Sequence, residues 1–329
     1  MDSTTSFMSW SDSKPREYHP PFLHRWRHLA TILPNQLRPI RFEFDERLTF
    51  ETPDGDFFHV DHAKHDPKRI AIVMHGLEGE SRSNHILGMA KALSIHGWSI
   101  LAPNHRSCDD IPNRLVTSYH SGFTQDLRQL IDGLDTDVSV VVIGFSLGGN
   151  IALKYAGETA PPPQVKCVVA ISVPVHLSSS GVVLAKWYNS IYRIRFMRKL
   201  RKKTIAKCQT FPDAGLDEHA IRSSKYFKEF DNAYTAPVHG FKDAEDYYER
   251  SSALQFLSQI QTPTLLINAQ NDSFLSSQCF PDVEAASNPN IHYLKPRFGG
   301  HVGFATDNAM KKEFWHERQV IDFIQTFDP

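Results

Sequence analysis

Cysteine and long apolar runs are both scarce in this chain of 329 residues. The four cysteines, Cys108, Cys167, Cys208 and Cys279, lie far apart and form no Cys-x-x-Cys pair. This spacing argues against a disulfide scaffold and against a structural zinc site, so a reducing, cytoplasmic compartment is expected. The longest apolar run, residues 138–145, is far too short to cross a bilayer. The N-terminal residues lack the apolar segment of a secretory signal.

An excess of charge of either sign is also missing. Lys and Arg total 36 and Asp and Glu total 37, which gives a formal net charge of −1. A globally basic nucleic-acid binder is therefore excluded, and no nucleic-acid partner is expected. Apolar residues make up 41% and charged residues 22%, the profile of a soluble globular chain with a large core.

Apolar strands alternate with amphipathic helices through the first half of the chain. The expected strands cover residues 69–76, 98–106, 138–146 and 165–174, and the helices between them cover residues 85–97, 124–134 and 147–157. Strands that are apolar throughout are buried on both faces, which is typical of a parallel sheet covered by helices. The pattern predicts an α/β fold with a mostly parallel central sheet.

The alternation defines three regions. Residues 1–45 form an N-terminal arm, with a short helix or an extended segment after a polar start. Residues 46–174 and 262–329 form the core, which begins with a hairpin over residues 47–62 around Pro53-Asp54-Gly55-Asp56. Residues 175–261 are mainly helical and charged, and we interpret them as a helical cap inserted into the core.

The segment Gly144-Phe145-Ser146-Leu147-Gly148 is the first candidate site. It follows an apolar strand and opens a helix, which is the setting of a nucleophile elbow. So sharp a turn strains the serine backbone and is tolerated only if Gly144 and Gly148 lack Cβ atoms. It exposes the Ser146 hydroxyl and aims the Leu147 N–H at a developing oxyanion. A glycine-rich turn with a bystander serine is the alternative.

Two further residues complete a candidate triad. His301 follows Gly299-Gly300 on a loop beyond the last expected strand, where open α/β sheets bind ligands. A serine hydroxyl needs a neighbouring base, and histidine is suited to that role. Asp272 follows the strand at residues 264–267 and would orient the imidazole, with Asp282 as the fallback. The order Ser146, Asp272, His301 matches that of the α/β-hydrolase triad.

A second oxyanion donor is expected after the early strand. Met74-His75-Gly76-Leu77-Glu78-Gly79 occupies that place, and the Leu77 N–H is the predicted donor. His75 is interpreted as a structural residue of the turn because His301 already supplies the base.

The cap segment carries two side-chain patterns. Leu184, Trp187, Tyr188, Ile191 and Ile194 recur at helical spacing, with seven Arg and Lys residues between positions 193 and 203. We interpret this pattern as a cap helix with a solvated basic side; contact with an anionic lipid surface or with an acidic substrate is the alternative. A second stretch is aromatic and predicts a cap core or an acyl pocket: Phe227, Phe230, Tyr234, Phe241, Tyr247 and Tyr248.

Nine stretches from about Phe22 to the end resemble one family. They are HLATILP, TPDGDF, HGLEG, APNHRSC, GFSLGGNIALKY, FDNAYTAPVHGF, DYYERSSA, INAQNDSF and GGHVGF. Together they are similar to the AB-hydrolase-4 group of esterases and lipases in the α/β-hydrolase superfamily. Two positions depart from the pattern, because Gln is usual where Ala30 stands and Gly where Ser107 stands. Many animal members begin with a membrane anchor, and no such anchor is expected in this chain.

The resemblance implies an α/β-hydrolase fold, a triad of Ser146, Asp272 and His301, and oxyanion donors at Leu77 and Leu147. It also implies hydrolysis of medium-chain or lipid-like acyl esters, with no metal or organic cofactor. The alternatives are an acyltransferase that passes the acyl group to an alcohol, and a catalytically silent binder of the same fold. The serine at position 146 argues against dehalogenase and epoxide-hydrolase chemistry, which need a carboxylate nucleophile.

Overall fold

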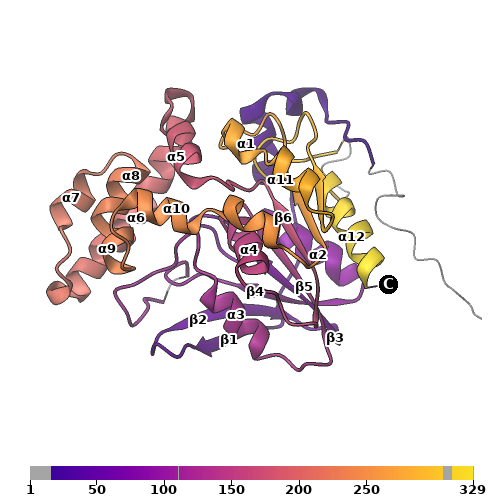
Figure 1. Cartoon of the computed structure of the whole chain (residues 1–329), viewed down its shortest axis with the longest axis horizontal. Coiled ribbons are helices and arrows are strands. Elements are labelled where there is room, and N and C mark those ends of the chain that lie inside the picture. The colour runs from indigo at the N-terminus through magenta and orange to yellow at the C-terminus, as the bar shows by residue number, and fades with distance from the viewer. Residues whose placement is uncertain (1–15, 110, 307–312, 329) are drawn as a thin grey trace, which may run out of the picture.

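The computed structural model describes residues 16–109, 111–306 and 313–328. Its centre is one eight-stranded sheet with the order β1-β2-β4-β3-β5-β6-β7-β8 (Figure 1). The strands are β1 (Glu46–Glu51), β2 (Phe57–Ala63), β3 (Asp66–Met74), β4 (Trp98–Pro103), β5 (Ser139–Phe145), β6 (Val165–Ile171), β7 (Thr264–Ile267) and β8 (Ile291–Leu294). The hairpin β1–β2 is antiparallel, β2 pairs antiparallel with β4, and the remaining pairs are parallel. The predicted α/β architecture and hairpin are confirmed.

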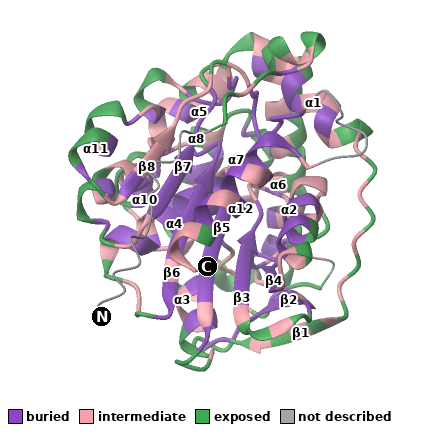
Figure 2. Ribbon diagram, turned by 90° about the vertical axis from the view of Figure 1, so that its right-hand side faces the viewer, coloured by how far each residue is buried: buried purple, intermediate pink, exposed green. Residues whose placement is uncertain are grey.

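Helices cover both faces of the sheet. One face packs against α2 (Asn84–Ile95) and α12 (Trp315–Phe327), and the other against α3 (Gln125–Asp132) and α4 (Leu147–Glu158). The central strands β5 and β6 are buried along nearly their whole length, and β3 is buried from Ile70 to Met74 (Figure 2). Side chains of alternating positions enter opposite cores, so Val140 and Val142 meet α4 whereas Val141 and Ile143 meet α2. This two-sided burial is the reason the strands are apolar throughout.

A helical segment is inserted between β6 and β7 and lies beyond one end of the sheet (Figure 1). Its elements are α5 (Leu177–Ala185), η2 (Trp187–Asn189), α6 (Ser190–Thr210), η3 (Pro212–Ala214), α7 (Glu218–Ser223), α8 (Phe227–Phe230), η4 (Asp231–Thr235), α9 (Ala236–Val238), α10 (Ala244–Ser251) and η5 (Ala253–Gln259). Phe230 and Tyr234 form one small core, and Tyr247 and Tyr248 form another with Leu177. The aromatic stretch therefore packs within the insertion, as the cap-core interpretation predicted.

The N-terminal arm contains η1 (Phe22–Arg25) and the helix α1 (Arg27–Leu37). The expected polar start lies mostly outside the described residues. The helix α1 packs closely on the loop that carries His301, because a Cβ at Gly300 would lie 2.8 Å from Ala30 Cβ. Two short elements, η6 (Ser277–Cys279) and α11 (Asp282–Ser287), link β7 to β8.

The apolar residues of the cap pattern do not share one buried side. Trp187, Ile191 and Ile194 are exposed by 83%, 65% and 60%, so they do not form a buried side. The expected solvated basic side is also partly internal, because Lys203 and Lys207 donate hydrogen bonds to the core domain. Arg195, Arg198, Lys199 and Lys202 are exposed, as a solvated basic side predicts. The apolar repeat from Leu184 to Ile194 does not lie on one continuous helix, because the backbone turns at Lys186–Asn189.

Candidate active site

The turn between β5 and α4 has the strained geometry of a nucleophile elbow. Ser146 has φ 53° and ψ −116°, a conformation that costs free energy for a residue with a side chain. A Cβ at Gly144 would lie 2.2 Å from Gly148 O, and a Cβ at Gly148 would lie 2.6 Å from His75 O. No other residue fits at these two positions without moving backbone. The strain and the tight packing hold the Ser146 side chain at the carboxyl edge of the sheet.

His301 lies on a tight loop after β8. Gly299 and Gly300 precede it with φ 148° and 60°, a backbone that residues with a Cβ rarely adopt. The Gly300 N–H donates to Asn271 Oδ1 at 2.9 Å, and the His301 N–H donates to Thr31 Oγ1 at 3.0 Å. These bonds attach the loop to the segment after β7 and to α1, so they fix where the imidazole can lie.

Ser146, His301 and Asp272 form one hydrogen-bonded line. His301 Nδ1 lies 2.8 Å from Asp272 Oδ2, and His301 Nε2 lies 3.0 Å from Ser146 Oγ. An ionised carboxylate only accepts hydrogen bonds, so it favours the tautomer with the proton on Nδ1. Nε2 is then free to accept from the serine hydroxyl. The fallback residue Asp282 lies elsewhere, on α11, and forms an ion pair with Lys295 at 2.6 Å.

The loop after β3 lies directly beside the nucleophile. A Cβ at Gly76 would lie 3.0 Å from Ser146 Cβ. Leu77 is the next residue, so it belongs to the loop that borders the nucleophile. Glu78 next in the chain has φ 54°, which turns the loop back sharply. Leu147 begins α4, where helix geometry leaves N–H groups without an intrahelical acceptor. Both predicted oxyanion donors therefore lie near the Ser146 hydroxyl.

Three histidines near this region have lowered pKa values; His75 and His105 are buried, and His85 is half-buried. Burial lowers the pKa of His85 to about 3 and that of His105 to about 4, and it lowers the pKa of His75 far below its ordinary value. His75 is fixed by its neighbours, because His75 Nδ1 lies 2.7 Å from Gly76 O and its Nε2 accepts from the His105 N–H at 3.1 Å. These bonds support the structural interpretation of His75.

Two side chains that contact His301, those of Phe274 and Thr31, were not predicted from the sequence. The ring of Phe274 stacks on His301 with a centroid distance of 4.1 Å, and Thr31 comes from a helix 270 positions away. Phe274 lies two residues after Asp272 in the same stretch, INAQNDSF, so an inspection of that stretch could have found it. Thr31 gives no local signal.

An ion pair with the buried carboxylate of Glu78 joins the insertion to the loop after β3. We call this loop, residues 75–79, the oxyanion loop because it carries Leu77. Lys203 of α6 contacts Glu78 Oε2 at 3.0 Å, and Lys199 of the same helix donates to Glu78 O at 3.0 Å. The Glu78 N–H donates to Tyr119 Oη at 2.8 Å. The basic residues of α6 thus fix the loop that carries Leu77.

One of the two departures from the family pattern has a structural consequence. Ser107 has φ 67°, a conformation that favours glycine. Its backbone N–H donates to the side chain of Asn113, which gives the strained turn a partner. The expectation that glycine suits this position agrees with the backbone geometry.

The comparison with known families agrees with this architecture. The model of the α/β hydrolase fold family matches residues 72–307, which is more than half of the chain. YheT of Escherichia coli (strain K12), which carries the name of an esterase, is 31% identical over 91% of this chain and 90% of its own length. The chain therefore belongs to the α/β-hydrolase family, in its esterase and lipase group, as the resemblance to the AB-hydrolase-4 group predicted.

Two further relatives differ more. The monoacylglycerol lipase of Saccharomyces cerevisiae is 26% identical over 85% of this chain and 63% of its own length. The esterase Pf2001 of Pyrococcus furiosus has a solved structure with a TM-score of 0.57, 16% identity, and coverage of 95% of this chain and 99% of that one. At 16% identity, the likeness to Pf2001 concerns the fold alone. Among the described residues, no helix is both long and apolar enough to cross a membrane.

Proposed function

We propose that Ser146, His301 and Asp272 are a catalytic triad that hydrolyses carboxylic esters through an acyl-enzyme. The observation that carries this proposal is the continuous line of hydrogen bonds, 3.0 Å from Ser146 Oγ to His301 Nε2 and 2.8 Å from Nδ1 to Asp272 Oδ2. Nucleophile, base and orienting carboxylate thus stand in the order and at the distances that serine hydrolases require.

The reaction proceeds in two halves. Ser146 Oγ attacks the ester carbonyl carbon while His301 Nε2 takes the hydroxyl proton. The carbonyl oxygen becomes an oxyanion that accepts hydrogen bonds from the N–H groups of Leu77 and Leu147. The C–O bond to the alcohol then breaks, and His301 returns the proton to the leaving alcohol. Water, deprotonated by His301, then attacks the acyl carbon. The bond from that carbon to Ser146 Oγ breaks, Oγ takes the proton back from His301, and the acid leaves as the second product. Asp272 stabilises the imidazolium in both halves.

The substrates that we propose are medium-chain or lipid-like acyl esters. Two observations support this class: apolar side chains surround the site, with Phe274 on the imidazole and Leu77 beside the nucleophile, and one relative carries the name monoacylglycerol lipase. We further propose that residues 46–174 and 262–329 act as the catalytic core, that residues 175–261 act as its cap, and that residues 1–45 act as an arm that supports the His301 loop.

Steady-state turnover of p-nitrophenyl esters tests the triad. Ser146→Ala is expected to lower kcat on the order of a millionfold, because the nucleophile is removed. Ser94→Ala, at a half-buried position near the end of α2, is the matched control and keeps its activity. Undiminished turnover by the Ser146→Ala protein with unchanged circular dichroism would refute the nucleophile. A series from butyrate to palmitate esters then measures the acyl chain length that the site prefers.

The fate of the acyl group separates hydrolysis from transfer. The same acyl-enzyme can react with an added alcohol in place of water, which would form a new ester. The ratio of acid to new ester, measured as ethanol is added, identifies the preferred acceptor. A product that is mainly ester at low alcohol concentration would make the protein an acyltransferase with the same triad.

A further inference from the structure

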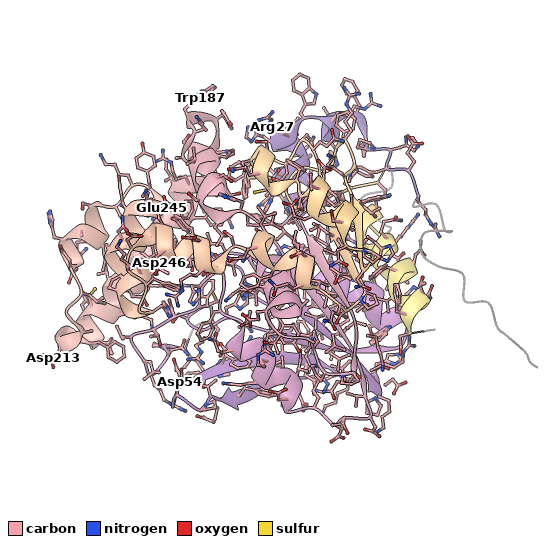
Figure 3. All side chains as sticks on the ribbon, viewed as in Figure 1. Arg27, Asp54, Trp187, Asp213, Glu245 and Asp246 are labelled. Carbon is pink, nitrogen blue, oxygen red and sulfur yellow. The ribbon has the colours of Figure 1, made fainter. Side chains whose placement is uncertain are left out.

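Exposed large apolar side chains gather on two segments at one end of the molecule. They belong to η1 and the start of α1, and to η2 and the start of α6, and they are Phe22 (71% exposed), Leu23 (54%), Trp26 (65%), Trp187 (83%), Ile191 (65%) and Ile194 (60%). We call this set the apolar rim. Figures 1 and 2 both place α1 and α5 at the same end, and Figure 3 shows Trp187 and Arg27 there. An exposed apolar cluster of this kind marks an interaction surface.

Side-chain contacts hold the two segments together. His28 Nδ1 lies 3.2 Å from Tyr192 Oη, and the rings of these residues stack at a centroid distance of 5.7 Å. The guanidinium of Arg27 lies 5.7 Å from the ring centre of Tyr188. The arm and the cap therefore present the apolar rim as one surface, even though 164 positions separate His28 from Tyr192 in the chain.

The charge of these segments is entirely positive. No acidic residue occurs between Glu17 and Glu43, and none occurs between Glu158 and Asp213. Four exposed basic residues flank the apolar rim: Arg25, Arg27, Lys186 and Arg195. On α6 the exposed residues Ile191, Ile194, Arg195 and Arg198 follow the spacing of one helix face. Within these two segments, aromatic and aliphatic side chains thus occur with cations and without carboxylates.

We propose that the apolar rim docks the protein on an anionic lipid surface. Indole rings favour the boundary between headgroups and acyl chains, and aliphatic side chains enter the acyl layer. Arg and Lys attract anionic headgroups, and the two segments of the apolar rim contribute no carboxylate that would repel them. A protein partner or a second copy of this chain would have to supply carboxylates to match the same cations.

Side-chain contacts connect the two segments of the apolar rim to the catalytic groups. The inner side of α1 carries Thr31, which accepts from the His301 N–H. Tyr192 of α6 contacts Phe274 at a centroid distance of 4.8 Å, and Phe274 stacks on His301. A membrane bound at the apolar rim would therefore lie next to the elements that contact His301. The docking itself rests on the exposed side chains and not on the proposed function.

Vesicle sedimentation with the full chain tests the docking. All proteins carry Ser146→Ala, so that lipid is not consumed and binding is measured apart from activity. Binding to vesicles of phosphatidylcholine mixed with phosphatidylglycerol is expected to exceed binding to phosphatidylcholine alone. Arg25→Ala with Arg195→Ala should weaken it by about fivefold for each charge removed. Trp26→Ser with Trp187→Ser should weaken it by about tenfold or more.

A matched pair of isoleucines provides the control. Ile191 in the apolar rim and Ile95 at the end of α2 are 65% and 67% exposed. Ile191→Ser is expected to weaken vesicle binding, whereas Ile95→Ser leaves it unchanged. Equal binding by these two variants, or no binding of the parent protein to the mixed vesicles, would overturn the proposal. So would a dimer in light scattering that Trp26→Ser with Trp187→Ser converts to a monomer, because the rim would then bind a second copy.

Discussion

Asp272 is held in place from two directions. Its Oδ1 accepts from the Phe274 N–H at 2.8 Å, and its Oδ2 accepts from His301 Nδ1 at 2.8 Å. The first bond fixes the plane of the carboxylate, and the second fixes the imidazole. Because the residue is 5% exposed, water competes little for either oxygen. The orientation of the base therefore depends on this one side chain.

Asp272→Asn is expected to lower kcat by about four orders of magnitude. The amide can donate to Nδ1, which places the proton on Nε2 and leaves Ser146 without an acceptor. Measurement of kcat for p-nitrophenyl butyrate, with circular dichroism to follow the fold, checks this result. Asp282→Asn is the control and is expected to retain activity, since Asp282 pairs with Lys295 on the surface. A loss in the Asp282 variant and none in the Asp272 variant would contradict the assignment.

The positions of the triad residues could be predicted because each follows a strand of a parallel sheet. The carboxyl ends of such strands meet at one edge, so Ser146 after β5, Asp272 after β7 and His301 after β8 are brought together by topology. Thr31 could not be predicted, because its contact with the His301 loop depends on how α1 packs.

At the scale of elements, the helix α6 of the insertion contacts the oxyanion loop through Lys203. Lys203 reaches Glu78, whose carboxylate is almost fully buried. The Tyr119 hydroxyl lies 3.1 Å from the same carboxylate, at Oε1. A buried charge needs such partners, because its desolvation is otherwise uncompensated. The cap and the loop with Leu77 are thus connected through one ion pair.

Lys203→Met is expected to lower the free energy of unfolding by about 3–5 kcal/mol, because Glu78 remains buried without its cation. It should also lower kcat, since Glu78 follows Leu77 in the oxyanion loop. Urea unfolding and kcat measure the two effects. Lys202→Met, on the exposed side of the helix, is the matched control. Glu78→Gln added to Lys203→Met should recover part of the stability; a further loss would contradict the ion-pair explanation.

Asp231 makes the stability of the insertion depend on pH. Burial raises its pKa from 3.8 to about 6, against the lowering effect of hydrogen bonds from Thr235 and Tyr248. The folded state thus retains a proton that the unfolded chain releases near pH 4. The free energy of unfolding therefore falls as pH rises from about 4 to about 6, by a total on the order of 3 kcal/mol. Above pH 6 this contribution does not change further.

Asp231→Asn is expected to remove this dependence, because the amide does not ionise. The difference in the free energy of unfolding between the variant and the parent should therefore grow in favour of the variant from pH 4 to pH 6. Urea unfolding at several pH values measures it. A difference that stays constant over this range would show that Asp231 does not titrate as described.

The periodicity of a helix predicts which residues share a side, but not which side is buried. In α6 the aliphatic residues Ile191 and Ile194 are exposed, whereas Lys203 and Lys207 point inward. The inward lysines bind acceptors from residues 78, 115 and 117, far away in the chain. No local pattern contains those acceptors, so the orientation could not be predicted from the sequence.

At the scale of the whole molecule, the two ends of the described chain are joined by a buried ion pair. Arg38, just after α1, donates to both carboxylate oxygens of Glu317 in α12, at 2.5 and 2.8 Å. The guanidinium also lies 3.9 Å from the ring centre of Phe314. Burial raises the pKa of Glu317, although Arg38 opposes this shift. The pair anchors the arm that supports the His301 loop.

Arg38→Met is expected to destabilise the fold by about 3–5 kcal/mol, because Glu317 is left buried without a partner. Since α1 packs on the loop of His301, kcat should fall at temperatures where the core is still folded. Thermal unfolding and activity measured side by side check this order. Arg41→Met, at an exposed position of the same arm, is the control. Equal effects of the two substitutions would contradict the role of the buried pair.

The most direct test of the central claim is covalent labelling with a fluorophosphonate, followed by peptide mass spectrometry. An activated Ser146 hydroxyl attacks phosphorus, so the account predicts one adduct, on Ser146, in the parent protein. It predicts no adduct in Ser146→Ala, and much slower labelling in His301→Ala, because the base is missing. A parent protein that stays unlabelled, or a label on another serine that persists in Ser146→Ala, would contradict the account.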